Sequence, residues 1–389
     1  MFQKYIFPLI ILALSTAIFV FSPVLSQSFH PKKTQSQHFV SAKVENILDE
    51  NVFEDDLAPG IYRGTQHLKI KVLEGEHENE TVEINNPLSR QHNVLLNEGS
   101  EFILMIRETI HGSHFWAFNH QRATAIYTMT AVFIGLILIF GGRSGFNAVI
   151  SLYFTAALII GVLIPAIFKG INPALVTIVL MAIKIIVNFI LVSGFNKKSL
   201  CAILGTLIGV ITAGIFAQTF GEWAHLSGIY LDKGEDVIYL AANHPIQVRW
   251  LMFVTIMIAA LGAVMDVAIS IASSYQELQH ANPTLTPRQL MLSSMNIGKD
   301  IMGTMTNTLI LAFAGSSLTT IMMVWGLSMP VEQFINTPVI ALSIIHGLAG
   351  SIGIVLTIPF TAFVASKIFD HQSNKNSVIN ANVNNALDK

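Results

Sequence analysis

PALVTIVLMAIKIIVNFILV, residues 173–192, is a run in which Lys184 is the only charged side chain. A helix of about 20 apolar residues crosses the hydrocarbon layer of a bilayer. Helix is the expected structure there, because every backbone N–H and C=O in lipid must be paired internally. The run therefore predicts a membrane-spanning helix.

Seven further runs have the same character, so the expected fold is mostly α, a polytopic helical membrane bundle. The eight candidate spans are residues 5–25, 123–140, 146–168, 173–192, 199–220, 250–273, 301–328 and 338–367. The 389-residue chain is 52% hydrophobic and 12% charged, about half the charge content of an ordinary soluble domain. These values exclude a conventional soluble enzyme, and a net charge of −2 gives no basic field for nucleic acid.

The orientation of the bundle is predicted from its short loops. Residues 1–26 are either an uncleaved anchor or a signal peptide, and the length of the apolar run favours the anchor. An excess of Lys and Arg marks the cytoplasmic side, which predicts that both termini are cytoplasmic. The basic residues on that side are Lys4, Arg143, Lys197, Lys198, Arg288, Lys299, Lys367, Lys375 and Lys389, against Lys169, Lys233 and Arg249 outside.

Residues 27–121 have a different character and are expected to form a small extracytoplasmic β domain. Segments 39–48, 66–73, 81–84, 101–106 and 115–118 alternate polar and apolar residues or are rich in β-branched ones. Turn-forming residues separate them, which favours a five-stranded antiparallel barrel. Residues 122–369 then form the seven-span domain, and the Asn- and Ser-rich residues 370–389 form a disordered cytoplasmic tail.

A polar stripe runs along the predicted span 250–273. Gly262, Asp266, Ser270 and Ser274 recur at a spacing of four and Glu277 follows, so they share one helix face. A charge inside a span costs about 2.5 kcal/mol or more at its centre. Two interpretations stay open at this point: Asp266 lies on an ion or proton path, or it pairs within the bundle.

A second polar stripe begins at the next span. Asp300, Thr304 and Thr308 recur at a spacing of four, with Asn307 beside them and Lys299 directly before them. Such a row either lines a hydrated path or joins helices through hydrogen bonds of about 0.6 kcal/mol each. We favour the path, because Asp266 and Asp300 are expected at similar depth.

Lys184 shares a helix face with Thr177 and Asn188 in the middle of its span. A pair with Asp266 would reduce the desolvation penalty of both charges. The alternatives are contacts with backbone carbonyls, or a side chain that reaches the interface along its apolar stem.

Other polar or small residues in the spans are expected to serve packing. Small residues repeat at every fourth position from Cys201 to Ala217, which lets two helices approach closely. His346 is a weaker candidate for proton transfer, because such a histidine is more often neutral and hydrogen-bonded.

No motif indicates an enzyme. The glycine-rich segment 141–145 lacks the lysine and the strand–loop–helix context of a phosphate-binding loop. Hydrolase elbows, zinc-ligand spacings and paired cysteines are absent from the sequence as well. We therefore expect no catalytic residue, no cofactor and no metal.

Two long motifs carry a resemblance to a known family. GAVMDVAISIASS at 262–274 and GKDIMGTMTNTLIL at 298–311 resemble the YibE/F family of bacterial multi-pass membrane proteins, and the likeness extends over residues 39–369. The family often has arginine where Lys299 stands, and lysine keeps the charge without the planar fork. The resemblance implies a plasma-membrane protein that is often encoded beside a related protein, and it implies no substrate.

The leading hypothesis is a permease, or a permease component, for an unidentified small solute or ion. Its polar path would use Asp266, Ser270, Glu277, Lys299, Asp300, Thr304, Asn307 and Thr308, with Lys184 and Asn188 as partners. The alternative is a membrane scaffold or sensor that pairs with a paralogous membrane protein through its extracytoplasmic domain.

Overall fold

The computed structural model describes residues 3–26, 37–109 and 112–387, with side chains given for 6–23, 37–109 and 112–369. The chain packs as two compact units. The β unit is His30–Ile139, and the helical unit is Met1–Phe29 with Phe140–Lys389. Each unit has its own apolar core.

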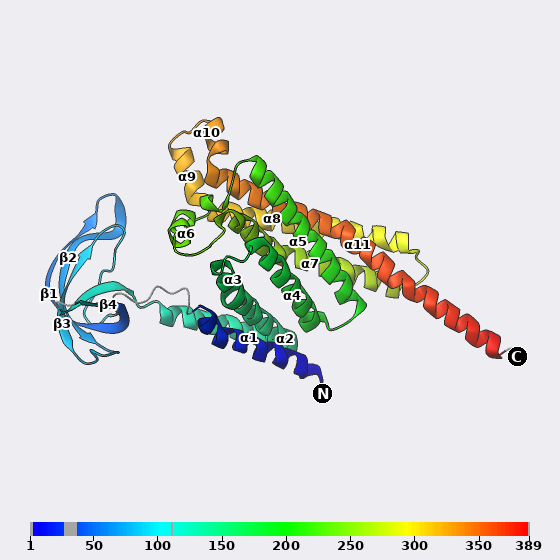
Figure 1. Ribbon diagram of the computed structural model, residues 1–389, viewed down its shortest axis with the longest axis horizontal. Helices are drawn as coiled ribbons and strands as arrows, with labels where there is room; N and C mark the ends of the chain where they lie inside the picture. The colour runs from blue at the N-terminus through cyan, green and yellow to red at the C-terminus, as the bar shows by residue number, and fades with distance from the viewer. Residues whose placement is uncertain (1–2, 27–36, 110–111, 388–389) are drawn as a thin grey trace. The chain divides into compact units, whose positions relative to one another are not determined.

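The β unit is one antiparallel sheet in the order β3-β2-β1-β4-β5 (Figure 1). Its strands are β1 (Gln37–Asp55), β2 (Ala58–Val72), β3 (Thr81–Leu88), β4 (Glu101–Thr109) and β5 (Gly112–His120). Alternate side chains face the core, as Leu68, Ile70 and Val72 of β2 do. The five expected strands are confirmed. The five strands form a curled sheet, with β3 and β5 at the two ends of the strand order.

β1 and β2 are both longer than the alternation of residue types predicted. Their pairing extends outward from Ala42–Val72 to Asp55–Ala58, beyond the part of the sheet that covers the core. Side chains there are mostly exposed, so the sequence has no buried alternation to mark this half of the hairpin. Backbone hydrogen bonds define the strands at this end.

The helical unit contains nearly all the remaining elements, and α2 begins within the β unit. The elements are α1 (Gln3–Ser26), α2 (Ala123–Leu158), η1 (Ile159–Leu163), α3 (Ile164–Phe168), α4 (Pro173–Ser193), α5 (Lys197–Trp223), η2 (Gly228–Tyr230), α6 (Gly234–Ala241), η3 (Val248–Trp250), α7 (Leu251–Ala281), α8 (Pro287–Ser316), α9 (Leu318–Gly326), α10 (Val331–Asn336) and α11 (Pro338–Leu387). The tail predicted at 370–389 stays a prediction, since no side chain beyond Phe369 is described.

Local sequence explains where several of these helices begin. Asn172 caps α4 by accepting from the backbone N–H groups of Ala174 and Leu175, with Pro173 in the first turn. Thr286 and Gln289 form a reciprocal capping box at the start of α8. These caps satisfy backbone donors that the first turn of a helix leaves free.

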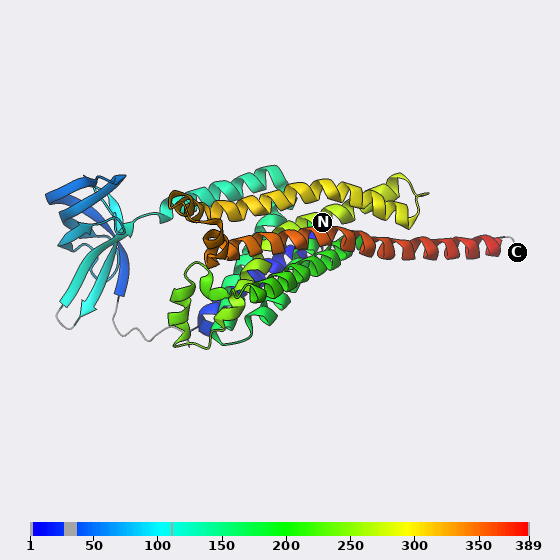
Figure 2. The same cartoon turned by 90° about the horizontal axis from the view of Figure 1, so that it is seen from above.

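The small residues of α5 lie against α11, as expected for packing. A side chain at Gly205 would collide with Thr361, and one at Gly209 would collide with Thr357. α7 and α8 also contact α11, and Figure 2 shows α8 and α11 side by side. The four helices α5, α7, α8 and α11 therefore build the main core of the helical unit.

Six helices of the described chain are long and apolar enough to cross a membrane. One of them, Ala123–Phe168, has 46 residues and would be about two bilayer thicknesses long if straight. It breaks at Gly142, whose φ of 49° and ψ of −121° are not helical, and this position lies between the two spans predicted at 123–140 and 146–168.

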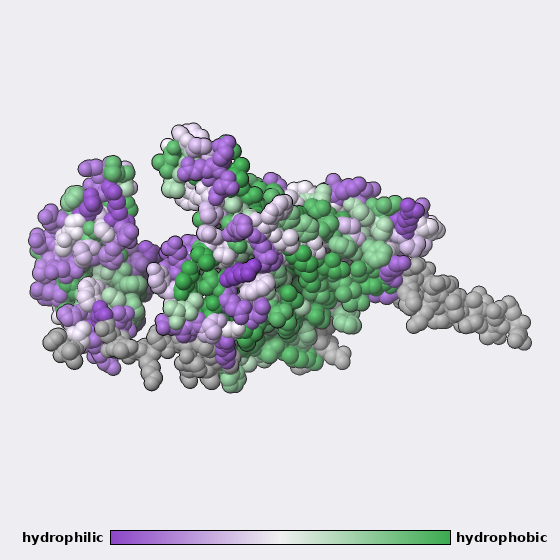
Figure 3. All heavy atoms as spheres, turned by 45° about the horizontal axis from the view of Figure 1, so that its top comes forward, coloured by the Kyte–Doolittle hydropathy of each residue, from purple (hydrophilic) through white to green (hydrophobic). Residues whose placement is uncertain are grey.

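The expected span 301–328 is bent rather than straight. α8 and α9 meet at 61°, and only together do they reach the length and apolarity of a span. Figure 3 shows apolar side chains over the middle of the visible face of the helical unit. The chain is thus a multi-pass helical membrane protein with a β unit.

Candidate functional site

The polar stripe of α7 lies on the surface of the helical unit. Asp266 and Glu277 are exposed, and Ser270 is half-buried. The Ser270 hydroxyl donates to the backbone carbonyl of Asp266 at 2.7 Å, which is a bond within one helix. Among the described residues, nothing donates to the Asp266 carboxylate or pairs with it. Its placement therefore rules out the interpretation in which Asp266 pairs inside the bundle.

The stripe of α8 is arranged in the same way. Asp300, Thr304, Asn307 and Thr308 are all exposed. Thr304 donates to the carbonyl of Ile301 at 2.9 Å, and Thr308 to that of Thr304 at 2.9 Å. Both bonds stay within α8, so these hydroxyls do not join helices of this chain.

Lys299 turns toward its own helix as well. Its Nζ donates to Asn296 Oδ1 at 3.0 Å. Within the described part of the chain, neither the Asp300 carboxylate nor the Asn307 amide has a hydrogen-bond partner. Lone pairs and N–H groups on this face are free for water, an ion or another protein.

The exposed carboxylates and amide have an energetic consequence in a membrane. A charged side chain within a span costs about 2.5 kcal/mol or more when hydrocarbon surrounds it. Asp266 and Asp300 have no partner that reduces this cost, as described above. We use the name polar face for the two stripes together, which are Asp266 and Ser270 on α7 and Asp300, Thr304, Asn307 and Thr308 on α8.

Lys184 belongs to a different, buried cluster. Its Nζ donates to Ser151 Oγ at 3.1 Å and to Asn188 Oδ1 at 3.1 Å, and Ser151 donates to Asn188 Oδ1 at 2.5 Å. Among the described residues, no carboxylate forms an ion pair with Lys184. The pair of Lys184 with Asp266 considered above is therefore wrong, because the amine is already held between α2 and α4.

The α2 residues of this cluster, Asn147 and Ser151, were not among the residues predicted from the sequence. Ser151 contacts Lys184, and Asn147 donates to the carbonyl of Leu191 at 2.7 Å. The available signal was the spacing of four between Asn147 and Ser151 in an apolar run, which places both on one helix face. A hydroxyl beside an amine is also the arrangement of some nucleophile–base pairs, but both side chains here are at least nine-tenths buried.

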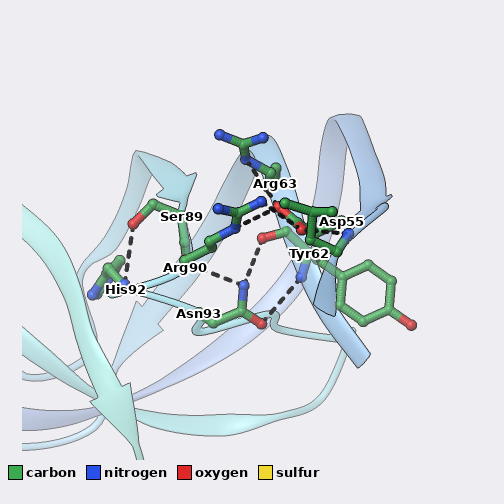
Figure 4. A network of polar contacts seen from close by, with 8 residues as sticks. Asp55, Tyr62, Arg63, Ser89, Arg90, His92 and Asn93 are labelled. Carbon is green, nitrogen blue, oxygen red and sulfur yellow. Dashed lines mark hydrogen bonds and ion pairs between the residues drawn. The ribbon is translucent and has the colours of Figure 1, made fainter. Parts of the chain in front are cut away.

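The β unit has a polar network of its own (Figure 4). The Asp55 carboxylate is 1% exposed and accepts two bonds of 2.9 Å from the Arg90 guanidinium. Arg63 lies 3.4 Å from the same carboxylate. The hydrogen bonds from Arg90 lower the pKa of Asp55 below its ordinary value of 3.8. This carboxylate is fully engaged and holds the 89–93 loop to the β1–β2 hairpin.

No preformed metal site exists in the described part of the chain, where no three His, Cys, Asp or Glu side chains are grouped to hold an ion. The polar face presents carboxylate, amide and hydroxyl groups.

The fold and the polar face together define a polytopic helical membrane protein of the α-bundle class. A sequence model described as YibE/F-like protein matches residues 129–371, and the chain belongs to that family. The match includes α7 and α8 with both polar stripes. No curated protein and no solved structure matches the chain.

Proposed function

We propose that this protein is a permease, or the membrane component of one, in the bacterial plasma membrane. The observation that carries the proposal is the polar face, where Asp266, Asp300 and Asn307 are exposed on membrane helices without a partner among the described residues. Intramembrane acids of this kind mark ion, proton or substrate paths. A cation or a proton binds the two carboxylates, and its movement drives that of a small solute.

The same face supports a role as one component among several. An exposed row of polar groups is stable in a membrane when water or another protein covers it. A second, paralogous membrane subunit placed on α7 and α8 would enclose a hydrated path between the two proteins. Lys184 and Asn188 lie outside this path in the proposal, since they are bound to Ser151.

Reconstitution tests the permease role directly. The protein, with and without a co-expressed paralogue, is placed in liposomes, and flux of protons and small solutes is followed under a pH gradient. Asp266→Asn and Asp300→Asn should each abolish flux, because the amide cannot release or accept the proton. Glu332→Gln is the matched control, since this exposed acid lies on α10, and it should leave flux unchanged. Equal flux in wild type and Asp266→Asn contradicts the proposed path.

A scaffold or sensor role is the second candidate, and an aromatic patch on the β unit favours it. The rings of Phe39 and Phe118 stand 4.8 Å apart, and both are about half exposed. Exposed aromatic residues are enriched in protein interfaces. Capture of a paralogue that is lost with Phe118→Ser but kept with Asp266→Asn would favour this role over transport.

The proposed orientation places both termini in the cytoplasm and residues 27–121 outside. Cys201 is fully buried and is the only cysteine of the chain. A thiol reagent should therefore label a cysteine introduced at an exposed position and leave Cys201 unlabelled. Glu98→Cys, on the β unit, should react with a membrane-impermeant maleimide added to intact cells, whereas Gln289→Cys should react only after lysis. The reverse pattern would overturn the orientation.

A further inference from the structure

A cavity of about 840 Å³ lies in the helical unit, away from the polar face. Its walls are the segment from Ile229 to Asp236, the end of α8 with the start of α9, and the first turns of α11. We name it the α6 cavity, because α6 begins in its wall. Neither Asp266 nor Asp300 lines it.

His346 of α11 is the most unusual of the residues that line the α6 cavity. Its side chain is more than nine-tenths buried, yet neither ring nitrogen has a hydrogen-bond partner among the described residues. The ring packs edge to face against Phe313, with 5.7 Å between centroids. His346 is one of the side chains that line the cavity.

A buried polar atom without a partner is destabilising by about 1–3 kcal/mol. Native proteins therefore pair such atoms with a protein group, water or a ligand. The expectation from sequence was a hydrogen-bonded histidine, and the structure gives His346 no such bond. This orphaned imidazole is the observation that points to a ligand.

Hydroxyl oxygens provide further acceptors in the same cavity. Ser317 and Ser343 are hydrogen-bonded to each other at 2.9 Å, and Ser343 Oγ donates to the carbonyl of Val339 at 3.0 Å. Each hydroxyl has only one proton to donate. Both protons are used in these bonds, so the remaining lone pair of Ser317 can only accept.

The charge of the cavity favours a cation. Lys233 lies 3.8 Å from Asp236, while Asp232 and Glu235 have no ion-pair partner among the described residues. Glu235 lies in the first turn of α6, where an acid complements the helix dipole, so these carboxylates alone would not indicate a ligand. Combined with the imidazole and the hydroxyl acceptors, they give the cavity an excess of lone pairs and negative charge.

We propose that the α6 cavity binds a small protonated amine. Its N–H groups donate to His346 and to the Ser317 hydroxyl, and Asp232 and Glu235 supply the opposite charge. Its alkyl part lies against Phe313 and Leu342, which also line the cavity. A bare metal ion fits less well, because the described residues bring no three metal-type ligands together. This binding goes beyond the proposed permease role and does not require that solute be carried.

Equilibrium binding to the full-length protein in nanodiscs tests the proposal without a transport gradient. The probe is n-butylammonium chloride, followed by titration calorimetry. n-Butanol is the uncharged comparison with the same alkyl chain, and manganese chloride is the metal-only comparison. The wild-type protein should bind butylammonium and should not bind butanol at the same concentration.

Two variants and two controls identify the site. His346→Leu should weaken butylammonium binding by about tenfold or more, because leucine has no acceptor for this charge-assisted hydrogen bond. Asp232→Asn combined with Glu235→Gln should also weaken it, and more so at low salt. His280→Gln and Glu332→Gln alter exposed residues that do not line the cavity, and they should bind as wild type does.

Three results overturn the amine site. They are equal affinity for butanol, binding of manganese with none of butylammonium, and unchanged affinity in both cavity variants. The acidic double variant lies in an exposed segment, so it keeps the test decisive if His346→Leu does not fold. Because no flux is measured, a protein that fails the permease test still reports on this site.

Discussion

The buried amide of Gln66 in the β unit is hydrogen-bonded on both sides, whereas the exposed carboxylates of the polar face have no partner among the described residues. Gln66 is fully buried and bonded to Leu96 through both its amide nitrogen and its amide oxygen. Asp266 and Asp300, on membrane helices, have no partner among the described residues. Polar groups in the β unit therefore stabilise the fold, and those of the polar face are available for binding.

The strongest test of this contrast removes a satisfied group. Gln66→Leu should lower the free energy of unfolding of the β unit by about 2–4 kcal/mol, because it leaves the Leu96 N–H and C=O buried without partners. Hydrogen–deuterium exchange of the full-length protein should show faster exchange at Leu96. If Leu96 were equally protected in the variant and in wild type, the hydrogen bonds of Gln66 would not be what holds Leu96 in place.

The next test concerns the helix packing that supports the polar face. Gly205→Ala should destabilise the helical unit by about 1–3 kcal/mol, because the new methyl group collides with Thr361. Gly262→Ala is the matched control, since nothing lies within 4 Å of a side chain placed there. The two variants should differ in melting temperature in detergent, and equal values would contradict the close contact of α5 with α11.

The pH dependence of unfolding provides a further test, because it concerns the paired Asp55 carboxylate of the β unit. Because Arg90 lowers the pKa of Asp55 below 3.8 in the folded state, the unfolded state takes up the proton more readily. The stabilisation is complete above the ordinary pKa and is lost as pH falls through the lower, folded value. Unfolding of the β unit should therefore become easier below about pH 4.

Asp55→Asn should remove this part of the pH dependence, because the amide does not titrate. The comparison is made by exchange or proteolysis of the β unit in the full-length protein across the acid range. Identical acid profiles of the variant and wild type would show that Asp55 is not the group responsible.

The smallest effect on stability is expected at the polar face. Asp266→Asn and Asp300→Asn should each change the free energy of unfolding by less than about 0.5 kcal/mol, the usual range for exposed substitutions without partners. Thermal unfolding in detergent measures this, and the flux test measures their functional effect. A large loss of stability would instead make these acids structural.

Sequence reasoning placed most elements because their signals are local. Apolar run length predicts spans, and period-two burial predicts strands such as β4 and β5, since each depends only on neighbouring residues. The bend between α8 and α9 falls at Gly315, Ser316 and Ser317, and Gly/Ser pairs are a known cause of helix kinks. The span prediction used the apolar content of the run and did not use this local signal.

The candidate site was predicted in part. The spacing of Asp300, Thr304 and Thr308 placed them on one face, as α8 shows. Spacing does not reveal whether a face is covered, because that depends on which helices pack against it. One of the two partners of Lys184, Ser151, was missed for the same reason, since it lies 33 residues away in the chain.

The amino-acid sequence alone determined that this chain crosses a membrane several times, carries a β unit and has polar stripes on two helices. Those properties follow from apolar run length, strand-type alternation and helical periodicity, which no distant contact alters. Only the tertiary structure decided that the stripes are exposed, that Lys184 binds Ser151 and that His346 is buried without a partner. Each of these facts depends on contacts between segments far apart in the chain, and periodicity carries no information about such contacts.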